Sequence, residues 1–137
     1  MDDLAKLIEI EKILKLKGRY QRALDAGQWD EFAACLADDF TVWETGMTAE
    51  LTGRDKVLAQ TRHSFETYGR WKHHVVCPVI EITSETTATG VWTVTSFDGI
   101  YEDEYVKVSG QWKVKRTRVT LSADYAAQDV RERRLKH

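Results

Sequence analysis

The second half of the chain contains four stretches that are typical of β-strands, and only short breaks separate them. The stretches are rich in β-branched and aromatic residues and cover residues 71–83, 86–97, 100–109 and 111–122. The breaks between them carry the residue pairs SE, DG and SG, which favour tight hairpin turns. Strands joined in this way pair antiparallel with their chain neighbours. We therefore expect a meander, with a bulge or bend in its first strand, where Pro78 cannot donate a ladder hydrogen bond.

The first half of the chain is predicted to begin with a long helix. Apolar residues between Leu4 and Leu24 recur at spacings close to three, four and seven, which is the period of one helix face. Asp2 and Asp3 suit a helix N-terminus, and Gly27 suits a helix end. We therefore expect this helix to end just before Gly27.

Two more helices and one more strand are predicted before the meander. A short helix is expected over residues 29–37, and the β-branched and aromatic residues of 39–45 indicate a strand. The third helix is expected over residues 52–69, where Thr52 as the N-cap and Asp55 three residues later resemble a capping box. Helices followed by an antiparallel meander predict the α+β class. A helix laid in the concave face of a curved sheet would enclose a pocket.

Composition indicates one soluble domain that spans residues 1–137. Hydrophobic residues make up 42% and charged residues 31% of the chain, which is typical of a globular protein. Twenty basic and 22 acidic side chains give a net charge of -2, which argues against nucleic acid or an anionic membrane as the partner. The opening residues do not resemble a signal peptide, and no apolar run reaches the ~18 residues of a membrane span. A cytoplasmic protein with Cys35 and Cys77 reduced is expected.

The pair His73-His74, with Cys77 nearby, raises the possibility of a metal site. If these residues lie on a strand, adjacent side chains point to opposite faces, and four residues at ~3.3 Å each separate His73 from Cys77 by ~13 Å. Zinc bonds are only ~2.0–2.3 Å long, so these residues alone do not form a metal site. Neither a serine nucleophile elbow nor a glycine-rich phosphate loop is present. We therefore expect no metal site in this stretch.

General acid–base chemistry remains, and it needs a base near neutrality, a group that orients the base, and a proton donor. Histidine suits the first role, a carboxylate the second and a phenol the third. Tyr20 and Asp25 lie late in the first predicted helix, about 140° apart around its axis at ~100° per residue. Spacing alone does not bring either residue to a histidine. A solvated Asp25 and a Tyr20 packed in the core remain the alternative.

Three segments carry a resemblance that covers most of the chain: KLKGRYQRALDAGQWDEF, HHVVCPVIEITSETTATGVW and YEDEYVKVSGQWKV. They resemble the SnoaL-like branch of the nuclear-transport-factor-2-like (cystatin-like) superfamily. Within it they are most similar to bile-acid 7α-dehydratase-like and scytalone-dehydratase-like lyases. The resemblance implies a cone-shaped fold, in which about three helices pack in a strongly curved, mostly antiparallel sheet around a deep cavity. It also implies a homo-oligomer, either a trimer or a dimer.

The resemblance further implies an elimination that needs no cofactor. By this comparison His73 is the base, Asp25 holds it, and Tyr20 binds the substrate oxygen or assists its departure. Two departures weaken the expectation of a steroid substrate. Ser96 stands where the bile-acid enzymes carry an acidic residue, and the loop at 97–100 is short.

We therefore expect a lyase of the dehydratase type, acting on an apolar cyclic or polycyclic hydroxy compound. Substrate-binding residues are expected among Trp43, Trp92, Tyr105, Arg116 and Arg118. A solvated outer face is the alternative for the two arginines, and His63 and His74 are expected to be structural or exposed. Two other functions stay open: an isomerase, hydratase or polyketide cyclase on the same fold, and a module that only binds ligands or assembles.

Overall fold

The computed structural model of the chain describes residues 1–123, which form three helices and one six-stranded sheet. The helices are α1 (Asp3–Ala26), α2 (Trp29–Ala34) and α3 (Arg54–Tyr68). The strands are β1 (Leu36–Glu44), β2 (Leu51–Thr52), β3 (Val75–Ile82), β4 (Thr87–Val94), β5 (Gly99–Val108) and β6 (Gln111–Leu121). Within these residues no helix is both long enough and apolar enough to cross a membrane.

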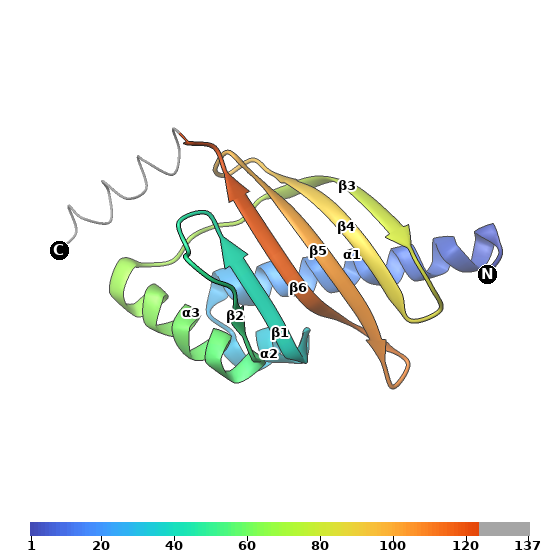
Figure 1. Cartoon of the computed structure of the whole chain (residues 1–137), viewed down its shortest axis with the longest axis horizontal. Coiled ribbons are helices and arrows are strands. Elements are labelled where there is room, and N and C mark those ends of the chain that lie inside the picture. Colours follow the sequence, from blue (N-terminus) through green and yellow to red (C-terminus); the bar gives the residue numbers. More distant parts are fainter. Residues whose placement is uncertain (124–137) are drawn as a thin grey trace.

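The strands follow the order β2-β1-β6-β5-β4-β3 in the sheet. The β1/β6 pair is parallel and every other pair is antiparallel, so β3 to β6 form the predicted meander. In Figure 1, α1 runs across one face of the curved sheet, while α3 lies beside β1 and β2. The α+β class and the curved, mostly antiparallel sheet are therefore confirmed.

Helix α1 begins and ends where the sequence predicts. The Asp2 side chain accepts a hydrogen bond from the Ala5 N–H at 2.8 Å, and Gly27 takes the left-handed conformation, with φ of 67°, that favours glycine. The second half of the helix packs against the sheet. Leu4 and Leu7 in the first turns are exposed, because this end of α1 extends beyond the sheet (Figure 1).

The region between α1 and the meander differs from the prediction at two places. Helix α2 is only six residues long, because the chain enters β1 at Leu36. Thr52 is not a helix cap: it lies in β2, where its hydroxyl is 3.1 Å from that of Thr41, and Gly53 precedes α3 instead. The predicted capping box is therefore wrong, because the partner strand β1 takes up Thr52.

Strand β3 starts later than predicted, at Val75, so His73 and His74 lie in the segment before it. The alternation of side chains along a strand therefore does not apply to the two histidines. The bulge expected near Pro78 is confirmed, because the pairing of β3 with β4 shifts between Val76 and Val79.

One glycine of the meander leaves space for the core. A Cβ atom on Gly90 in β4 would lie only 2.8 Å from Ile80 Cδ1 and from Tyr105 Cε2. The tyrosine ring therefore lies directly over the backbone of β4. This contact gives a packing reason for the glycine in the ATGVW segment.

Candidate active site

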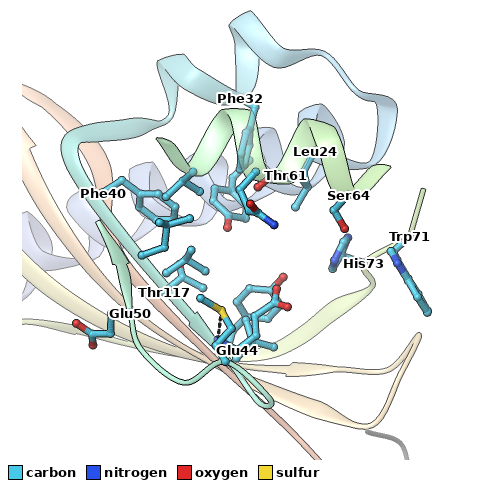
Figure 2. A pocket seen from close by; sticks show the side chains of 18 of the residues that line it. Leu24, Phe32, Phe40, Glu44, Glu50, Thr61, Ser64, Trp71, His73 and Thr117 are labelled. Atoms are coloured by element: carbon cyan, nitrogen blue, oxygen red, sulfur yellow. Dashed lines mark hydrogen bonds between the residues drawn. The ribbon is translucent and has the colours of Figure 1, made fainter. Parts of the chain in front are cut away.

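A cavity of about 450 Å³ opens between the helices and the inner face of the sheet. Its walls are mainly apolar and aromatic, with contributions from Leu24, Phe32, Phe40, Val57 and Phe65. Polar side chains also line it: Tyr20, Glu44, Glu50, Gln60, Thr61, Ser64, His73, Tyr101 and Thr117. Figure 2 shows His73 beside Ser64 on one side of the cavity, with Phe40 and Thr117 on the other side. An apolar pocket with few polar groups is the usual form of a small-molecule site.

His73 and Asp25 form a two-point contact at the cavity wall. His73 Nδ1 lies 2.6 Å from Asp25 Oδ1, and the backbone N–H of His73 donates to Asp25 Oδ2 at 2.9 Å. The carboxylate can only accept, so Nδ1 carries the hydrogen and Nε2 keeps its lone pair. The last turn of α1 therefore sets both the position and the tautomer of a histidine that is 48 residues away in the chain.

Aromatic rings hold the imidazole from the sheet side. The His73 ring lies edge-on to Phe97, with centroids 5.6 Å apart, and to Tyr101, with centroids 6.4 Å apart. The His73 side chain is 11% exposed and that of Asp25 is 23% exposed. The pair is thus largely shielded, which strengthens its mutual interaction and limits ring rotation.

Tyr20 reaches the cavity from α1 and is buried against Phe32, at a ring separation of 4.9 Å. Burial and the nearby Asp103 carboxylate raise the pKa of the Tyr20 phenol above its ordinary value. Burial likewise raises the pKa of Tyr101 well above the ordinary value. Both phenols therefore stay protonated at neutral pH and can donate a hydrogen bond.

Two of the five predicted substrate-binding residues face inward but lie behind the cavity. Trp92 Nε1 donates to Tyr105 Oη at 3.0 Å, and Tyr105 Oη donates to Asp103 Oδ2 at 2.7 Å. Asp103 in turn pairs with the buried Lys17 at 2.7 Å. Burial lowers the pKa of Lys17 and the adjacent carboxylate opposes this shift. Trp92 and Tyr105 therefore belong to a buried network and are not among the residues that line the cavity.

The other three predicted residues lie on the outer side of the sheet. The Arg118 guanidinium stacks on the Trp43 ring at 4.1 Å, and Arg116 pairs with Glu50 and Glu104. Alternate residues of a strand face opposite sides, so Thr117 of β6 faces the cavity while its two arginine neighbours do not. The alternative of a solvated outer face is what the structure shows for both arginines.

His63 and His74 are exposed, as expected. His63 lies on α3 and His74 follows the candidate base. The His74 N–H donates to Ser96 Oγ at 3.1 Å, so the serine that replaces the expected acidic residue bonds to the backbone. Among residues 1–123, no group of three or more His, Cys, Asp or Glu side chains is arranged to hold a metal ion.

The polar groups that sequence reasoning missed at or behind the cavity include Tyr101, Asp103 and Thr117. The signal for Tyr101 and Asp103 was the alternation in YEDEY, where Asp103 shares a buried face with Tyr101 and Tyr105. A carboxylate between two tyrosines on one strand face indicates a buried polar network. The partner Lys17 comes from α1, and no local pattern connects it to β5.

Comparison with known proteins agrees with this architecture. The SnoaL-like domain family matches residues 5–118. A proposed scytalone dehydratase from Novosphingobium aromaticivorans is 28% identical, with a TM-score of 0.70, and the match covers 83% of this chain and 84% of that one. A hexachlorocyclohexane dehydrochlorinase from Novosphingobium barchaimii is 17% identical, with a TM-score of 0.74 and coverage of 88% and 91%.

A variant of a Mycobacterium tuberculosis protein of unknown function has the same fold at 22% identity, with a TM-score of 0.76 and coverage of 99% of this chain and 93% of that one. The similar structures also include proteins described as having a cystatin-like fold. The family match extends from α1 into β6 and so includes every element that lines the cavity. The chain therefore belongs to the SnoaL-like domain family and has the cystatin-like, nuclear-transport-factor-2-like fold.

Proposed function

We propose that this protein is a cofactor-independent lyase that removes water from an apolar cyclic hydroxy compound. The observation that carries the proposal is the His73 Nδ1 to Asp25 Oδ1 contact of 2.6 Å at the wall of an apolar cavity. Similar structures include a proposed dehydratase and a dehydrochlorinase, and both names describe eliminations. The relatives support the reaction class, and the contacts of His73 support the roles given to the residues.

In the proposed reaction His73 Nε2 takes a proton from the carbon next to the one that bears the hydroxyl group. The electron pair of that C–H bond becomes the new C=C bond, and the C–O bond breaks with its pair on oxygen. The departing oxygen receives the proton from the imidazolium and leaves as water, so the histidine returns to its starting state. Asp25 stabilises the imidazolium while it exists.

Tyr20 is the group that we propose to bind the substrate oxygen. It lines the cavity and remains protonated at neutral pH. A phenol can donate to an oxygen on which negative charge increases, and such a bond strengthens as the reaction proceeds.

The walls of the cavity favour a ring system over a flexible polar substrate. Its volume of about 450 Å³ lies within the usual range for drug-sized ligands, ~300–1,000 Å³. Aromatic side chains such as Phe32, Phe40 and Phe65 offer flat apolar contact to a ring. We therefore propose a substrate of two or three fused or linked rings with a hydroxyl group.

The proposal is tested by screening pooled aromatic, terpenoid and steroid alcohols for loss of one water by mass spectrometry. His73→Ala is expected to lower kcat on an identified substrate by about 10²–10⁴-fold, the usual contribution of a general base. His74→Ala is the matched control, because the neighbouring imidazole is exposed and does not line the cavity. Full turnover by His73→Ala would contradict the assignment of His73 as the base. A product of unchanged mass would indicate an isomerase.

A further inference from the structure

A buried ion pair lies behind the cavity and has no part in the reaction proposed above. Lys17 Nζ is 2.7 Å from Asp103 Oδ2, and neither side chain has exposed surface. Asp103 also accepts hydrogen bonds from Tyr105 Oη at 2.7 Å and from Thr117 Oγ1 at 3.0 Å. Three donors satisfy the carboxylate as an anion, so the ammonium is held as its counter-ion.

The other close neighbours of this ammonium are aromatic faces. Lys17 Nζ lies 3.9 Å from the centre of the Tyr101 ring and 4.8 Å from that of Tyr20. Both rings line the cavity. Each phenol therefore contacts the buried cation and also forms part of the cavity wall. Tyr101 in addition lies edge-on to His73, the proposed base.

Stability alone gives little reason for this ion pair. Removing two charges from water is costly, and replacing a buried pair by apolar residues is often neutral or stabilising. A cation against an aromatic face is attracted to the ring electrons. It also draws electron density from the ring, which makes the hydroxyl of a phenol a stronger hydrogen-bond donor. Lys17 lies beside two phenols of the cavity wall. Its ammonium would therefore be attracted to both rings and would make both hydroxyls stronger hydrogen-bond donors.

We propose that Lys17 is a positioning residue of the cavity: its ammonium, anchored by Asp103, polarises the Tyr101 and Tyr20 phenols so that they bind an oxygen that carries negative charge. The inference rests on the proposed function, in which such charge develops on the substrate when His73 removes a proton. It deepens that function by naming the substrate class. The substrate carries a carbonyl or a second oxygen function that faces the two tyrosines and accepts charge from the adjacent carbon.

The test measures binding of 4-nitro-1-naphthol to the full chain, because this two-ring phenol has a coloured anion and its protonation can be read from absorbance. The unmodified protein is expected to bind the anion more tightly than the neutral form. Lys17→Met combined with Asp103→Asn removes both charges. The asparagine oxygen can accept from one of the Tyr105 and Thr117 hydroxyls, and its NH₂ group can donate to the other. This variant is expected to lower the ratio of anion to neutral affinity by about tenfold, between the scales of an exposed and a desolvated cation–π contact. In a background that combines Tyr20→Phe with Tyr101→Phe, the same change is expected to have less than about a twofold effect, because the effect acts through these two hydroxyls.

The matched control is the ion pair between Lys107 and Glu9, which is 3.0 Å long, lies 5.3 Å from the Trp112 ring and is remote from the cavity. Lys107→Met with Glu9→Gln is expected to leave the ratio unchanged. If Lys17→Met with Asp103→Asn does not fold, Lys17→Gln with Asp103→Asn provides a neutral pair that can still hydrogen-bond.

Three results would overturn the inference: no preference for the anion in the unmodified protein, an unchanged ratio in the neutral-pair variant, or equal falls with and without the Tyr20 and Tyr101 hydroxyls. The probe is not turned over, so these results do not depend on the reaction. Turnover by His73→Ala decides the proposed function separately.

Discussion

Replacing Asp25 with asparagine tests the geometry of the candidate dyad most directly. The carboxylate accepts two hydrogen bonds from His73, one from the ring Nδ1 and one from the backbone N–H. Asparagine has one acceptor oxygen and one NH₂ donor. If the oxygen keeps the backbone bond, the NH₂ group faces Nδ1, and the hydrogen of the imidazole moves to Nε2. The proposed base would then carry a proton on the nitrogen that must accept one.

The expected loss in kcat is about 10³–10⁴-fold, which corresponds to ~4–5.5 kcal/mol at 1.36 kcal/mol per factor of ten. The expected loss of stability is much smaller. One charge-assisted hydrogen bond contributes ~1.5–3 kcal/mol when buried, and the Asp25 side chain is 23% exposed, so we expect about 1 kcal/mol. The catalytic and structural effects of the substitution therefore differ clearly in size.

Steady-state turnover on the substrate found by screening measures the first effect, and urea unfolding measures the second. Asp25→Glu keeps the charge but moves it by one methylene, so it is expected to recover part of the activity. An Asp25→Asn protein with kcat within about threefold of the unmodified protein would refute the tautomer argument. A loss of activity that merely follows a loss of folded protein would refute it as well.

Two further predictions concern stability. Gly90→Ala is expected to lower the free energy of unfolding by about 1–3 kcal/mol in urea, because the new methyl group would lie 2.8 Å from Tyr105 Cε2. Gly18→Ala, which has open space around the new atom, is the control, and equal effects of the two would contradict the packing argument. Glu9→Gln is expected to destabilise the protein at neutral pH, because hydrogen bonds from Trp112 and Lys107 lower the pKa of Glu9 from 4.5 to about 2. A carboxylate with a lowered pKa stabilises the fold above its unfolded pKa, so the difference between the two proteins should shrink as pH falls from about 4.5 toward 2. Urea unfolding at several pH values measures this, and a difference that stays constant would contradict it.

The roles of the site residues could be predicted from the sequence only with the help of family resemblance. Spacing along α1 places Asp25 and Tyr20 in different directions around the helix axis. The structure shows why both can serve one site: Tyr20 lines the cavity, while Asp25 lies in the last turn and contacts the chain just before β3. A helix end and a loop meet here, and no periodic pattern encodes such a contact.

The five residues that were predicted to bind substrate do not line the cavity. Trp43, Arg116 and Arg118 are large and capable of binding a ligand, but strand alternation directs them away from the cavity. Trp92 and Tyr105 face inward, where α1 covers them. Whether an inward-facing residue meets a helix or open space depends on where the helix crosses the sheet.

The sequence by itself determined the order of the helices and of every strand except β2, the caps of α1, the hairpin meander and the bulge at Pro78. These features depend on backbone preferences and short-range hydrogen bonds, which act between residues close in the chain. Only the tertiary structure decided that His73 contacts Asp25 and that Lys17 contacts Asp103. It also decided that a cavity remains between the helices and the sheet. Such contacts join residues 48 and 86 positions apart. They arise from the angle at which α1 crosses the curved sheet, and the packing of all the helices and strands together sets this angle.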